Sequence, residues 1–570
     1  MNRVYNARRH TATRPHGPVT RVGRMVLLAL ALMLGTACTA PGDWPLLSVT
    51  SQTDRAPVVA TDAGRVAGAV QDGVVAFKGI PYAAPPVGDL RWRAPQPVTR
   101  WDGVRPAATF GADCAQAPGD LEQIQTTPAE DCLFVNVWRT VDNGGDTLLP
   151  VMVWIHGGGF VGGGTSIPWY DGSAFARQGI VVVSLNYRLS RLGFFAHPAL
   201  LNAAEGPVGN FGFMDQIAAL AWVQRNIVAF GGDPNRVTLV GQSAGGASVL
   251  ALLTSPAASG LFDQAVVLSG GGRNGLALRA MTGGVPDAPS ADQTDAAFAA
   301  SLDITGAGPE ALADLRALPA TTVQGDLNLE RLAAEALFGQ QIFQGTQMID
   351  GEIVVDHPGA LLARGQMPAV PLIIGTTAVD LPLFFPPSKL DPFAFFGSDA
   401  AAAQAAYAAP PVLDQESLAR LLLSMGADMT MHEPARYVAR QMTAHGNPVW
   451  LYRFTYTATT NRPGEPAQSH SGELPFLFDM LDARYDTAVS PADRATAHAF
   501  NAYVANFIKS GNPNGEGLTD WPLFDPAQFL LLDFTPDDGP RYGPDPRASR
   551  IELVERAFDR RAAQESGGDE

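Results

Sequence analysis

Short apolar runs alternate with longer stretches of helical spacing along most of the chain. Apolar residues three and four positions apart predict helices over 213–226 and 492–510. Runs rich in β-branched and aromatic residues predict buried strands over 151–155, 180–185, 237–240, 264–268, 370–374 and 450–456. This alternation is typical of an α/β fold with one large, mostly parallel central sheet flanked by helices on both faces.

Several stretches depart from this alternation. The prolines in 79–88 rule out regular structure there and predict a fixed, extended loop. Two Ala-rich stretches, 275–345 and 385–440, predict helical insertions that cover the edge of the sheet where ligands are expected to bind. Near the start, a meander of short strands is predicted over 58–60, 66–70 and 74–77. Since no repeat or linker divides the rest, we expect one domain over 56–565 and a disordered tail over 566–570.

Composition and charge limit the possible partners. The 570 residues are 46% hydrophobic and 17% charged, which is enough apolar material for a large core. The formal net charge is −17, and no long Lys/Arg cluster follows the N-terminal region. We therefore expect no nucleic acid partner, because phosphate backbones bind to basic surfaces.

The first 37 residues have the three parts of an export signal. Residues 1–24 are rich in arginine, 25–34 are almost wholly apolar, and 35–37 are small residues suited to cleavage. The apolar run is too short to remain as a membrane span. We predict a signal peptide over 1–37, an exported protein, and a flexible tether over 38–55.

Cys38 leaves two destinations open after export. It directly follows the predicted cleavage site, where bacterial lipoproteins carry the cysteine that becomes lipidated, although Gly35 stands where leucine is usual. Lipidation of Cys38 would tether the protein to a bacterial membrane. Without it, the protein would be secreted or periplasmic.

The other two cysteines, Cys114 and Cys132, flank a loop that contains Gln, Thr and Pro. In an oxidising compartment they can form a disulfide, which for a loop of this length stabilises a fold by about 3 kcal/mol. Two free buried thiols are the alternative, which the predicted export makes less favourable.

A serine in a glycine-flanked corner is the strongest chemical signal. Gly241 and Gly245 flank Ser243 in the spacing Gly-x-Ser-x-Gly, between a predicted strand and the start of a helix. Small neighbours permit a sharp turn that exposes the hydroxyl and strains the backbone. The corner also aims the N–H of Ala244 and the positive end of the helix at whatever Ser243 attacks. The spacing predicts a nucleophile.

A serine hydroxyl reacts only beside a base, and that base needs a carboxylate to orient it. His470 lies in a polar loop after the strand over 450–456, at the edge where parallel strands gather ligands. Asp380 is the only carboxylate in the loop after the strand over 370–374, and its apolar surroundings predict a buried partner. We predict a catalytic triad of Ser243, Asp380 and His470.

Other roles were weighed for these residue types. A helix cap near Pro382 is the alternative for Asp380. The remaining histidines after Ser243 lie in helical, capping or pre-strand positions that suit the mechanism less well: His357, His432, His445 and His498.

The glycine run over 156–160 follows the strand over 151–155. Residues without side chains let several N–H groups point at one developing negative oxygen. The spacing of Gly157, Gly159 and Gly162 also fits a dinucleotide-binding turn, but no helix follows at once and the next predicted strand lacks an acidic residue at its end. The sequence has no phosphate-binding loop and no zinc-site spacing. We therefore expect no cofactor and no metal.

At these motifs the sequence resembles the type-B carboxylesterases, the α/β-hydrolases that include cholinesterases and bile-salt-activated lipase. The matching stretches run from about Gly64 to Pro522 in fixed order and comprise 77–88, 130–138, 156–160, 232–238, 241–245 and 470–476. The resemblance implies an α/β-hydrolase fold with helical insertions over the active site, and a small-molecule ester as substrate.

The resemblance also implies roles for single residues. Ser243 is implied as the nucleophile and His470 as the base, and Cys114 and Cys132 as a disulfide. An oxyanion hole is implied for the N–H groups of Gly158, Gly159 and Ala244. Each of these assignments is an expectation about this chain.

Two positions depart from the usual pattern of that family. Most members carry Asp-Glu-Gly where this chain has Asp380 between Val379 and Leu381, so the acid is Asp, as in bile-salt-activated lipase. A shorter side chain must approach the histidine more closely. Gln242 replaces the frequent Glu beside the serine, which removes a charge and disfavours binding of choline-type cations.

Together these features predict a serine carboxylesterase that forms an acyl-enzyme on Ser243. A lipase or sterol esterase of the same fold is the first alternative, suggested by Cys38 and the apolar segments 381–387 and 395–396. A non-catalytic binding protein on the same scaffold is the second alternative. The presence of all three triad residues argues against it.

Overall fold

The structure is a computed structural model that describes residues 56–117, 123–142, 147–273, 278–285, 289–332, 346–381, 391–410, 412–462, 468–537 and 539–566. These residues belong to one compact unit, Arg55–Glu570. The predicted signal peptide, Cys38, the predicted tether and residues 567–570 lie outside the described residues, so the domain boundaries stay predictions. No described helix is long and apolar enough to cross a bilayer.

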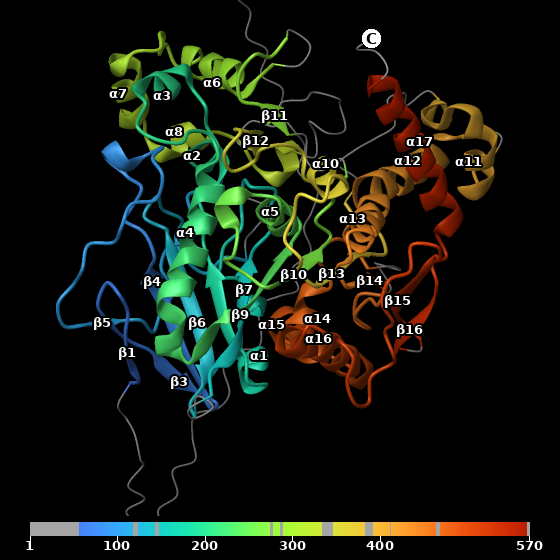
Figure 1. Ribbon diagram of the computed structural model, residues 1–570, viewed down its shortest axis with the longest axis horizontal. Coiled ribbons are helices and arrows are strands. Elements are labelled where there is room, and N and C mark those ends of the chain that lie inside the picture. The colour runs from blue at the N-terminus through green and yellow to red at the C-terminus, as the bar shows by residue number, and fades with distance from the viewer. Residues whose placement is uncertain are drawn as a thin grey trace, which may run out of the picture. The chain divides into compact units, whose positions relative to one another are not determined.

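A large mixed sheet forms the centre of this unit (Figure 1). Its eleven described strands have the order β16-β15-β14-β13-β10-β9-β7-β8-β6-β4-β3. From β15 through to β8 neighbouring strands pair in parallel, and the pairs toward both ends are antiparallel. The bounds are β3 (Ala69–Gln71), β4 (Val74–Pro81), β6 (Phe134–Thr140), β7 (Leu149–Ile155), β8 (Val181–Leu185), β9 (Gly232–Gln242), β10 (Gln264–Leu268), β13 (Leu372–Thr377), β14 (Val449–Phe454), β15 (Leu530–Thr535) and β16 (Gly539–Pro544).

Parallel pairing brings the carboxyl ends of the central strands to one edge of the sheet. Gln242 at the end of β9 lies opposite Leu268 at the end of β10. Leu268 in turn lies opposite Gly375 of β13, and Thr377 lies opposite Phe454 of β14. The segments that follow these four strands therefore start side by side, where ligands of α/β sheets usually bind.

Alternate residues of each strand face opposite layers, because side chains alternate across a pleated strand. Val153 of β7 and Leu239 of β9 share a core with α4 (Phe211–Asn226) and α5 (Ala244–Leu253). Their neighbours Trp154 and Val240 share a second core with α16. Both faces of the sheet are thus buried by helices, as the continuous apolar strands predicted. The helices of the second face are α1 (Ser173–Arg177), α14 (Leu474–Leu477) and α16 (Pro491–Ser510).

Both Ala-rich insertions are mainly helical where the structure describes them, although the first also holds the short strand β11 (Arg279–Ala280). Figure 1 shows α6, α7 and α8 grouped together, and α11 and α12 beside α17. Phe395 and Phe396 pack with Phe558 of α17 in a separate core cluster, so these aromatics fill an interior. Residues 382–390 lie outside the described residues. The bounds are α6 (Ala291–Ala300), α7 (Pro309–Ala317), α8 (Ala320–Gln324), α10 (Pro358–Ala363), α11 (Ala400–Ala406), α12 (Gln415–Ala427), the π-helix η6 (Asp428–His432), α13 (Glu433–Ala444) and α17 (Ala548–Ser566).

Smaller elements complete the described chain. A three-stranded sheet has the order β1-β2-β5, and β11 pairs with β12 in parallel. Their bounds are β1 (Val58–Ala60), β2 (Arg65–Ala67), β5 (Val104–Pro106), β11 (Arg279–Ala280) and β12 (Met348–Ile349). Further helices are α2 (Ser190–Gly193), α3 (Pro198–Ala203), α15 (Leu481–Tyr485) and the 3-10 helix η2 (Pro168–Tyr170).

One prediction about local structure was wrong. The prolines of 79–88 were expected to exclude regular structure, but β4 continues to Pro81, which pairs with Phe134. The register shifts between Phe77 and Ile80, where Gly79 has φ of 70°. A bulge of this kind restarts the strand, and a proline at the end of a strand costs little because its missing N–H is not needed there.

Candidate active site

Ser243 lies at the corner between β9 and α5, as the glycine spacing predicted. It is the N-cap of α5, with φ of 57° and ψ of −124°. Such a conformation costs a residue with a side chain roughly 1–3 kcal/mol. The N–H of Ser243 donates to the carbonyl oxygen of Leu268 at 2.9 Å, and its own carbonyl oxygen accepts from the N–H of Ala247 at 2.8 Å. Main-chain bonds to β10 and to the first turn of α5 therefore hold the strained corner.

The glycines beside the serine leave no room for side chains. A Cβ at Gly245 would lie 2.1 Å from the carbonyl oxygen of Ile155, and a Cβ at Gly241 would lie 2.3 Å from the carbonyl oxygen of Gly245. Both obstacles are backbone atoms, which cannot move aside cheaply. The glycine spacing thus lets the end of β7 approach the serine corner.

Asp380 and His470 are in direct contact. The Nδ1 of His470 lies 2.5 Å from the Oδ1 of Asp380, and the Asp380 side chain is fully buried. Val379 and Ser469 form a parallel bridge between the two loops, and the N–H of Val379 donates to the carbonyl oxygen of Gln468 at 2.9 Å. The sheet thus continues locally and brings the acid loop after β13 to the histidine loop after β14.

Three further donors surround the Asp380 carboxylate. The hydroxyl of Ser269 donates to Oδ2 at 2.6 Å, the N–H of Thr377 donates to Oδ2 at 3.1 Å, and the N–H of Leu381 donates to Oδ1 at 2.8 Å. Burial alone would raise the pKa of Asp380, but His470 and the Ser269 hydroxyl hold that pKa well below its usual range. The carboxylate is therefore ionised at neutral pH.

The same contact acts on the imidazole. Burial lowers the pKa of His470, but the charge and the hydrogen bond of Asp380, together with a smaller contribution from Glu473, outweigh it, so the net pKa lies above its ordinary value. An ionised partner at Nδ1 keeps the hydrogen of a neutral imidazole on that nitrogen. Nε2 is then the acceptor, and it lies 3.3 Å from the amide nitrogen of Gln242.

The hydrogen bond between Ser243 and His470 is not formed in this structure. Within the described residues, the hydroxyl of Ser243 has no hydrogen-bond partner, although Ser243 and His470 line the same cavity. The Gln242 amide instead lies within hydrogen-bonding distance of Nε2, the acceptor nitrogen of the His470 imidazole. Catalytic hydrogen bonds are often unformed before substrate binds. The structure thus places Ser243 and His470 in the lining of one cavity, with Asp380 buried in contact with His470, and forms one of the two hydrogen bonds that link the predicted triad.

Three main-chain N–H groups adjoin the same space. Gly158 and Gly159 have φ of 113° and 62°, conformations that favour glycine, and both line the cavity. Ala244 is the first residue of α5, where an N–H has no partner within the helix. In the described part of the chain, the N–H groups of Gly158 and Gly159 also donate to no other group.

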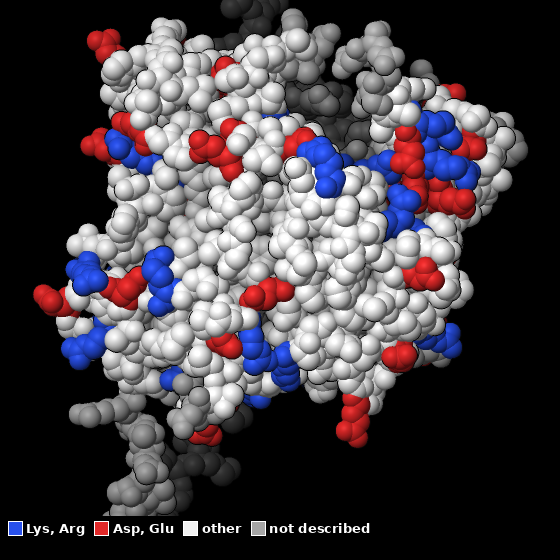
Figure 2. Space-filling view, viewed as in Figure 1, with Lys and Arg blue, Asp and Glu red and all other residues white. Residues whose placement is uncertain are grey.

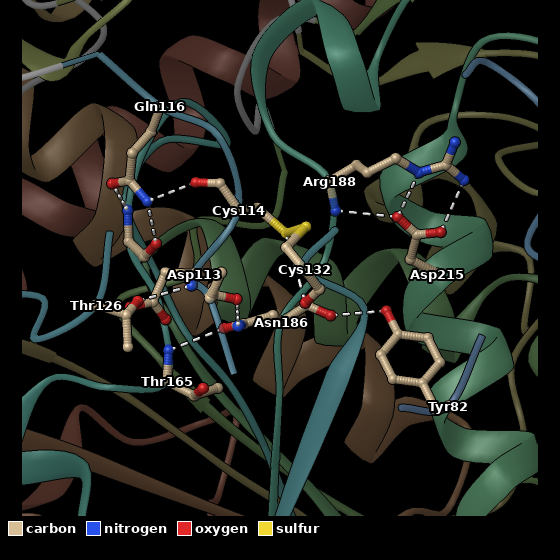
Figure 3. The surroundings of a disulfide bond; sticks show 12 residues. Tyr82, Asp113, Cys114, Gln116, Thr126, Cys132, Thr165, Asn186, Arg188 and Asp215 are labelled. Carbon is tan, nitrogen blue, oxygen red and sulfur yellow. Dashed lines mark hydrogen bonds and ion pairs between the residues drawn. A yellow bond between two sulfur atoms is a disulfide. The ribbon is translucent and has the colours of Figure 1, made fainter. Parts of the chain in front are cut away.

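A disulfide joins Cys114 to Cys132 beside the glycine loop (Figure 3). The amide nitrogen of Gln116 donates to the carbonyl oxygens of Cys114 at 2.9 Å and of Gly163 at 2.7 Å, and its amide oxygen accepts from the N–H of Gly163 at 2.9 Å. Gln123, inside the closed loop, lines the cavity. The loop between the cysteines is therefore tied both to the glycine loop and to the site.

The cavity has a volume of about 500 Å³, a size typical of sites for small molecules. Part of its lining is apolar: Leu329, Leu332 and Met431 come from the insertions, and Leu381 comes from the acid loop. Another part comes from η2 and from the segment after His470, namely Trp169, Tyr170, Leu474, Arg484 and Tyr485.

Glu473 is a buried carboxyl three residues after His470, and no separate feature of the sequence singles it out. Within the described residues, neither of its carboxyl oxygens has a hydrogen-bond partner. Burial, reinforced by the charge of Asp380, raises the pKa of Glu473 to about 8. The group is therefore mostly protonated at neutral pH.

His432 has a closer link to the site than the sequence indicated. It is packed inside the fold, with Nδ1 2.7 Å from the Oδ1 of Asp428 and Nε2 3.1 Å from the carbonyl oxygen of Thr377. Thr377 is the residue whose N–H binds Asp380. His432 thus supports the acid loop from the π-helix η6. The carboxylate of Asp428, four positions earlier, was the available signal.

Two further kinds of site were considered from the sequence, a metal site and a dinucleotide-binding turn. No set of three or more His, Cys, Asp or Glu side chains suited to a metal ion occurs among the described residues. The Gly157 to Gly162 turn leads into η2 only at Pro168, without the immediate helix of a dinucleotide site.

The parallel sheet, the serine corner and the acid–histidine contact at its edge are features of an α/β-hydrolase. The sequence model of the carboxylesterase family matches residues 55–394 and 397–547. The chain belongs to the carboxylesterase family and is a carboxylic ester hydrolase.

Relatives match nearly the whole described chain. It is 37% identical to the para-nitrobenzyl esterase of Bacillus subtilis (strain 168) over 84% of this chain and 94% of that protein. It is 33% identical to the fumonisin B1 esterase of Sphingopyxis macrogoltabida over 90% of this chain and 92% of that protein. The crystal structure of the Geobacillus stearothermophilus carboxylesterase superposes with a TM-score of 0.70 at 32% identity, covering 87% of this chain and 99% of that one.

Proposed function

We propose that this esterase works through an acyl-enzyme on Ser243, with His470 as general base and Asp380 as the group that orients it. The observation that carries the proposal is the 2.5 Å contact between His470 and Asp380, beside a strained serine corner on the same cavity. An ester carbonyl that enters the cavity meets a hydroxyl, a base and unpaired N–H donors together.

The reaction has two halves. The Ser243 oxygen attacks the ester carbonyl carbon while its proton passes to Nε2 of His470, and the negative oxygen is stabilised by the N–H groups of Gly158, Gly159 and Ala244. The intermediate collapses, and the leaving alkoxide takes the proton from His470. Water then gives a proton to His470 and attacks the acyl carbon, which releases the acid and restores Ser243.

Gln242 has a part in the first step of this proposal. Its amide lies 3.3 Å from the nitrogen that must accept the serine proton. The serine hydroxyl must therefore replace the Gln242 amide at Nε2 before it can react. Without substrate, the Ser243 hydroxyl faces the open cavity. A bound substrate gives this hydroxyl a partner, which favours its exchange with the Gln242 amide at Nε2.

The test compares serine variants with a p-nitrophenyl acetate assay. Ser243→Ala is expected to lower kcat/KM by about 10⁵-fold. Ser255→Ala is the matched control, because Ser255 is buried and its hydroxyl has no partner among the described residues. The control is expected to keep kcat/KM within about two-fold. Equal activity in wild type and Ser243→Ala would refute the assignment.

Small-molecule esters are the substrates supported for this site. The relatives are named for p-nitrobenzyl esters and fumonisin B1, and other relatives are named as cocaine esterases. The lipase alternative loses part of its basis because Phe395 and Phe396 are buried in a core cluster. A panel of p-nitrophenyl esters of increasing chain length is expected to show no jump in rate above the solubility limit.

We also propose that the protein is exported, with cleavage before Cys38 and lipidation of that cysteine. The arginine-rich and apolar segments before Cys38 support export, and the Cys114–Cys132 disulfide supports an oxidising destination. Detergent phase separation of the full chain tests the tether: wild type is expected in the detergent phase and Cys38→Ser in the aqueous phase. Recovery of both in the aqueous phase would favour simple secretion.

A further inference from the structure

Arg484 is a cation in the lining of the catalytic cavity. It lies on α15, in the segment that continues from His470. Among the described lining residues, Glu330 is the only other one with a permanent charge near neutral pH. Glu330 neighbours Leu329 and Leu332, which crowd the space beside Gly159. The two charges therefore belong to different parts of the cavity lining.

The guanidinium of Arg484 is stacked but not paired. Its Cζ lies 5.2 Å from the centre of the Trp169 ring. Within the described part of the chain, Arg484 makes no hydrogen bond and no ion pair. A cation–π contact uses the flat face of the guanidinium, so the N–H groups at its edge stay available for a ligand.

Several other arginines of the described chain have carboxylate partners. Arg494 of α16 donates to both oxygens of Asp482, at 2.8 and 3.1 Å. On the face shown in Figure 2, basic side chains lie close to acidic ones, and Arg556 and Arg560 both contact Asp399. In a chain with a net charge of −17, carboxylates are plentiful. An arginine that faces the cavity without one is therefore a distinct feature of this site.

We propose that Arg484 recognises an anionic group, of carboxylate type, on the ester substrate. This inference rests on the proposed function, because it adds a recognition group to the cavity of Ser243. The guanidinium edge can hold a carboxylate with two parallel hydrogen bonds. The Trp169 ring stacks on the face of the guanidinium and leaves its edge free to meet the ligand, and Leu474 and Tyr485 also line the cavity. The enzyme therefore prefers esters that carry a negative charge over neutral esters of equal size.

The alcohol part of the ester is the expected carrier of the charge. His470 returns its proton to the leaving alkoxide, so the alcohol part lies beside the histidine loop. The chain continues from that loop into α14 and α15, and η2 packs against both helices. Trp169 and Arg484 thus adjoin the path of the leaving alcohol.

The experiment uses two matched pairs of esters with the full-length enzyme. In the first pair the alcohol part carries the charge, with 4-acetoxybenzoate against 4-acetoxybenzamide. In the second pair the acyl part carries it, with the mono-p-nitrophenyl ester of adipate against p-nitrophenyl hexanoate. The measured quantity is the ratio of kcat/KM for the anionic ester to kcat/KM for the neutral ester.

Arg484→Gln is expected to lower this ratio about ten-fold in the first pair. Arg484→Lys keeps part of the ratio, because the charge remains while the fork is lost. Added salt lowers the ratio in wild type more than in Arg484→Gln. Arg494→Gln is the matched control: it removes the same charge from a neighbouring helix outside the cavity lining and leaves both kcat/KM values within about two-fold.

The outcomes separate this inference from the proposed function. If Arg484→Gln lowers the kcat/KM ratio in the second pair and not in the first, Arg484 remains the recognition group and the charge belongs to the acyl part. An unchanged ratio in both pairs would overturn the inference, while loss of neutral-ester hydrolysis in Ser243→Ala would still support the proposed function. Hydrolysis of neutral esters by Ser243→Ala at the wild-type rate would refute the proposed function itself.

Discussion

The Ser243 corner and the Asp380–His470 pair border the same cavity, but they are held in place by different means. Main-chain hydrogen bonds and glycines pressed against backbone atoms hold the serine. Side chains from three other segments hold the pair: Ser269 binds the carboxylate, Gln242 contacts the imidazole, and His432 binds the acid loop. The corner is therefore rigid as soon as the sheet and α5 are packed, whereas the pair depends on several replaceable hydrogen bonds.

This difference explains which hydrogen bond of the triad is not formed. The hydrogen bond absent from the triad is the one that crosses from the rigid corner to the side-chain network. To form it, the Gln242 amide must leave the Nε2 of His470. Substitutions in the two regions should consequently fail differently, with loss of folding stability at the corner and loss of rate at the pair.

The largest effect is expected from Asp380→Asn. Loss of the charge leaves the imidazole without its orienting partner, and kcat/KM is expected to fall by about 10⁴-fold. Because the Asp380 charge raises the pKa of His470, the acidic limb of the pH profile should also move to lower pH in the variant. A pH series with p-nitrophenyl acetate measures both changes. Asp520→Asn, which removes an exposed carboxylate, should alter neither, and an unchanged acidic limb in Asp380→Asn would contradict the assigned contact.

Gly245→Ala tests the corner. The added Cβ would meet the Ile155 carbonyl oxygen at 2.1 Å, so the free energy of unfolding should fall by about 3 kcal/mol. Gly543→Ala is the control, since a Cβ there has no atom within 4 Å. Urea unfolding of both variants provides the comparison. If Gly245→Ala unfolds like Gly543→Ala, the corner is less tightly packed than described.

Glu473→Gln tests the raised pKa of the buried Glu473 carboxyl. The measured quantity is the free energy of unfolding as a function of pH. Burial raises the pKa of Glu473 from 4.5 to about 8, so the folded state holds its proton more tightly than the unfolded state. The stability gained from this is complete below pH 4.5 and is lost as the pH rises towards 8. Wild type should therefore lose about 5 kcal/mol more than Glu473→Gln between the acidic and alkaline ends of that window. Parallel pH slopes for the two proteins would contradict the raised pKa.

The smallest of these effects is expected from Ser269→Ala. It removes one of the donors to Asp380, at 2.6 Å, and leaves the contact with His470 intact. The expected cost is about 1.5 kcal/mol in the barrier, which lowers kcat/KM about ten-fold. Ser255→Ala, the buried serine without a hydrogen-bond partner, is again the matched control. Equal rates in the two variants would show that the side-chain network is not needed for the pair.

The sequence predicted the serine corner well because its determinants are local. The strand, the glycines and the helix start lie within one short segment, and the structure has β9, Ser243 and α5 in that order. Six strands of the large sheet were located to within a few residues, because buried parallel strands are continuous apolar runs: β7, β8, β9, β10, β13 and β14. The strands β6, β15 and β16 were not predicted, and β4 is longer than predicted, since a bulge at Gly79 lets it continue to Pro81.

The supporting network was not predictable from the sequence. Ser269 and His432 act through contacts that exist only after β10, β13 and the π-helix have assembled, and the raised pKa of Glu473 arises only when the fold buries it near Asp380. A lone serine after a strand or a histidine in a helix carries no local sign of such a role. Arg484 likewise gains meaning only from its place in the cavity lining. Local geometry can be read from local sequence, whereas partners distant along the chain require the fold.

Covalent labelling of the enzyme tests the central claim most directly. The enzyme is treated with diethyl p-nitrophenyl phosphate, and the adduct is counted by intact mass and located by peptide mapping. The account predicts one diethylphosphoryl group per chain, on Ser243, with activity lost in proportion to labelling and no adduct in Ser243→Ala. An adduct on another residue that abolishes activity, or full activity after Ser243 is labelled, would contradict it.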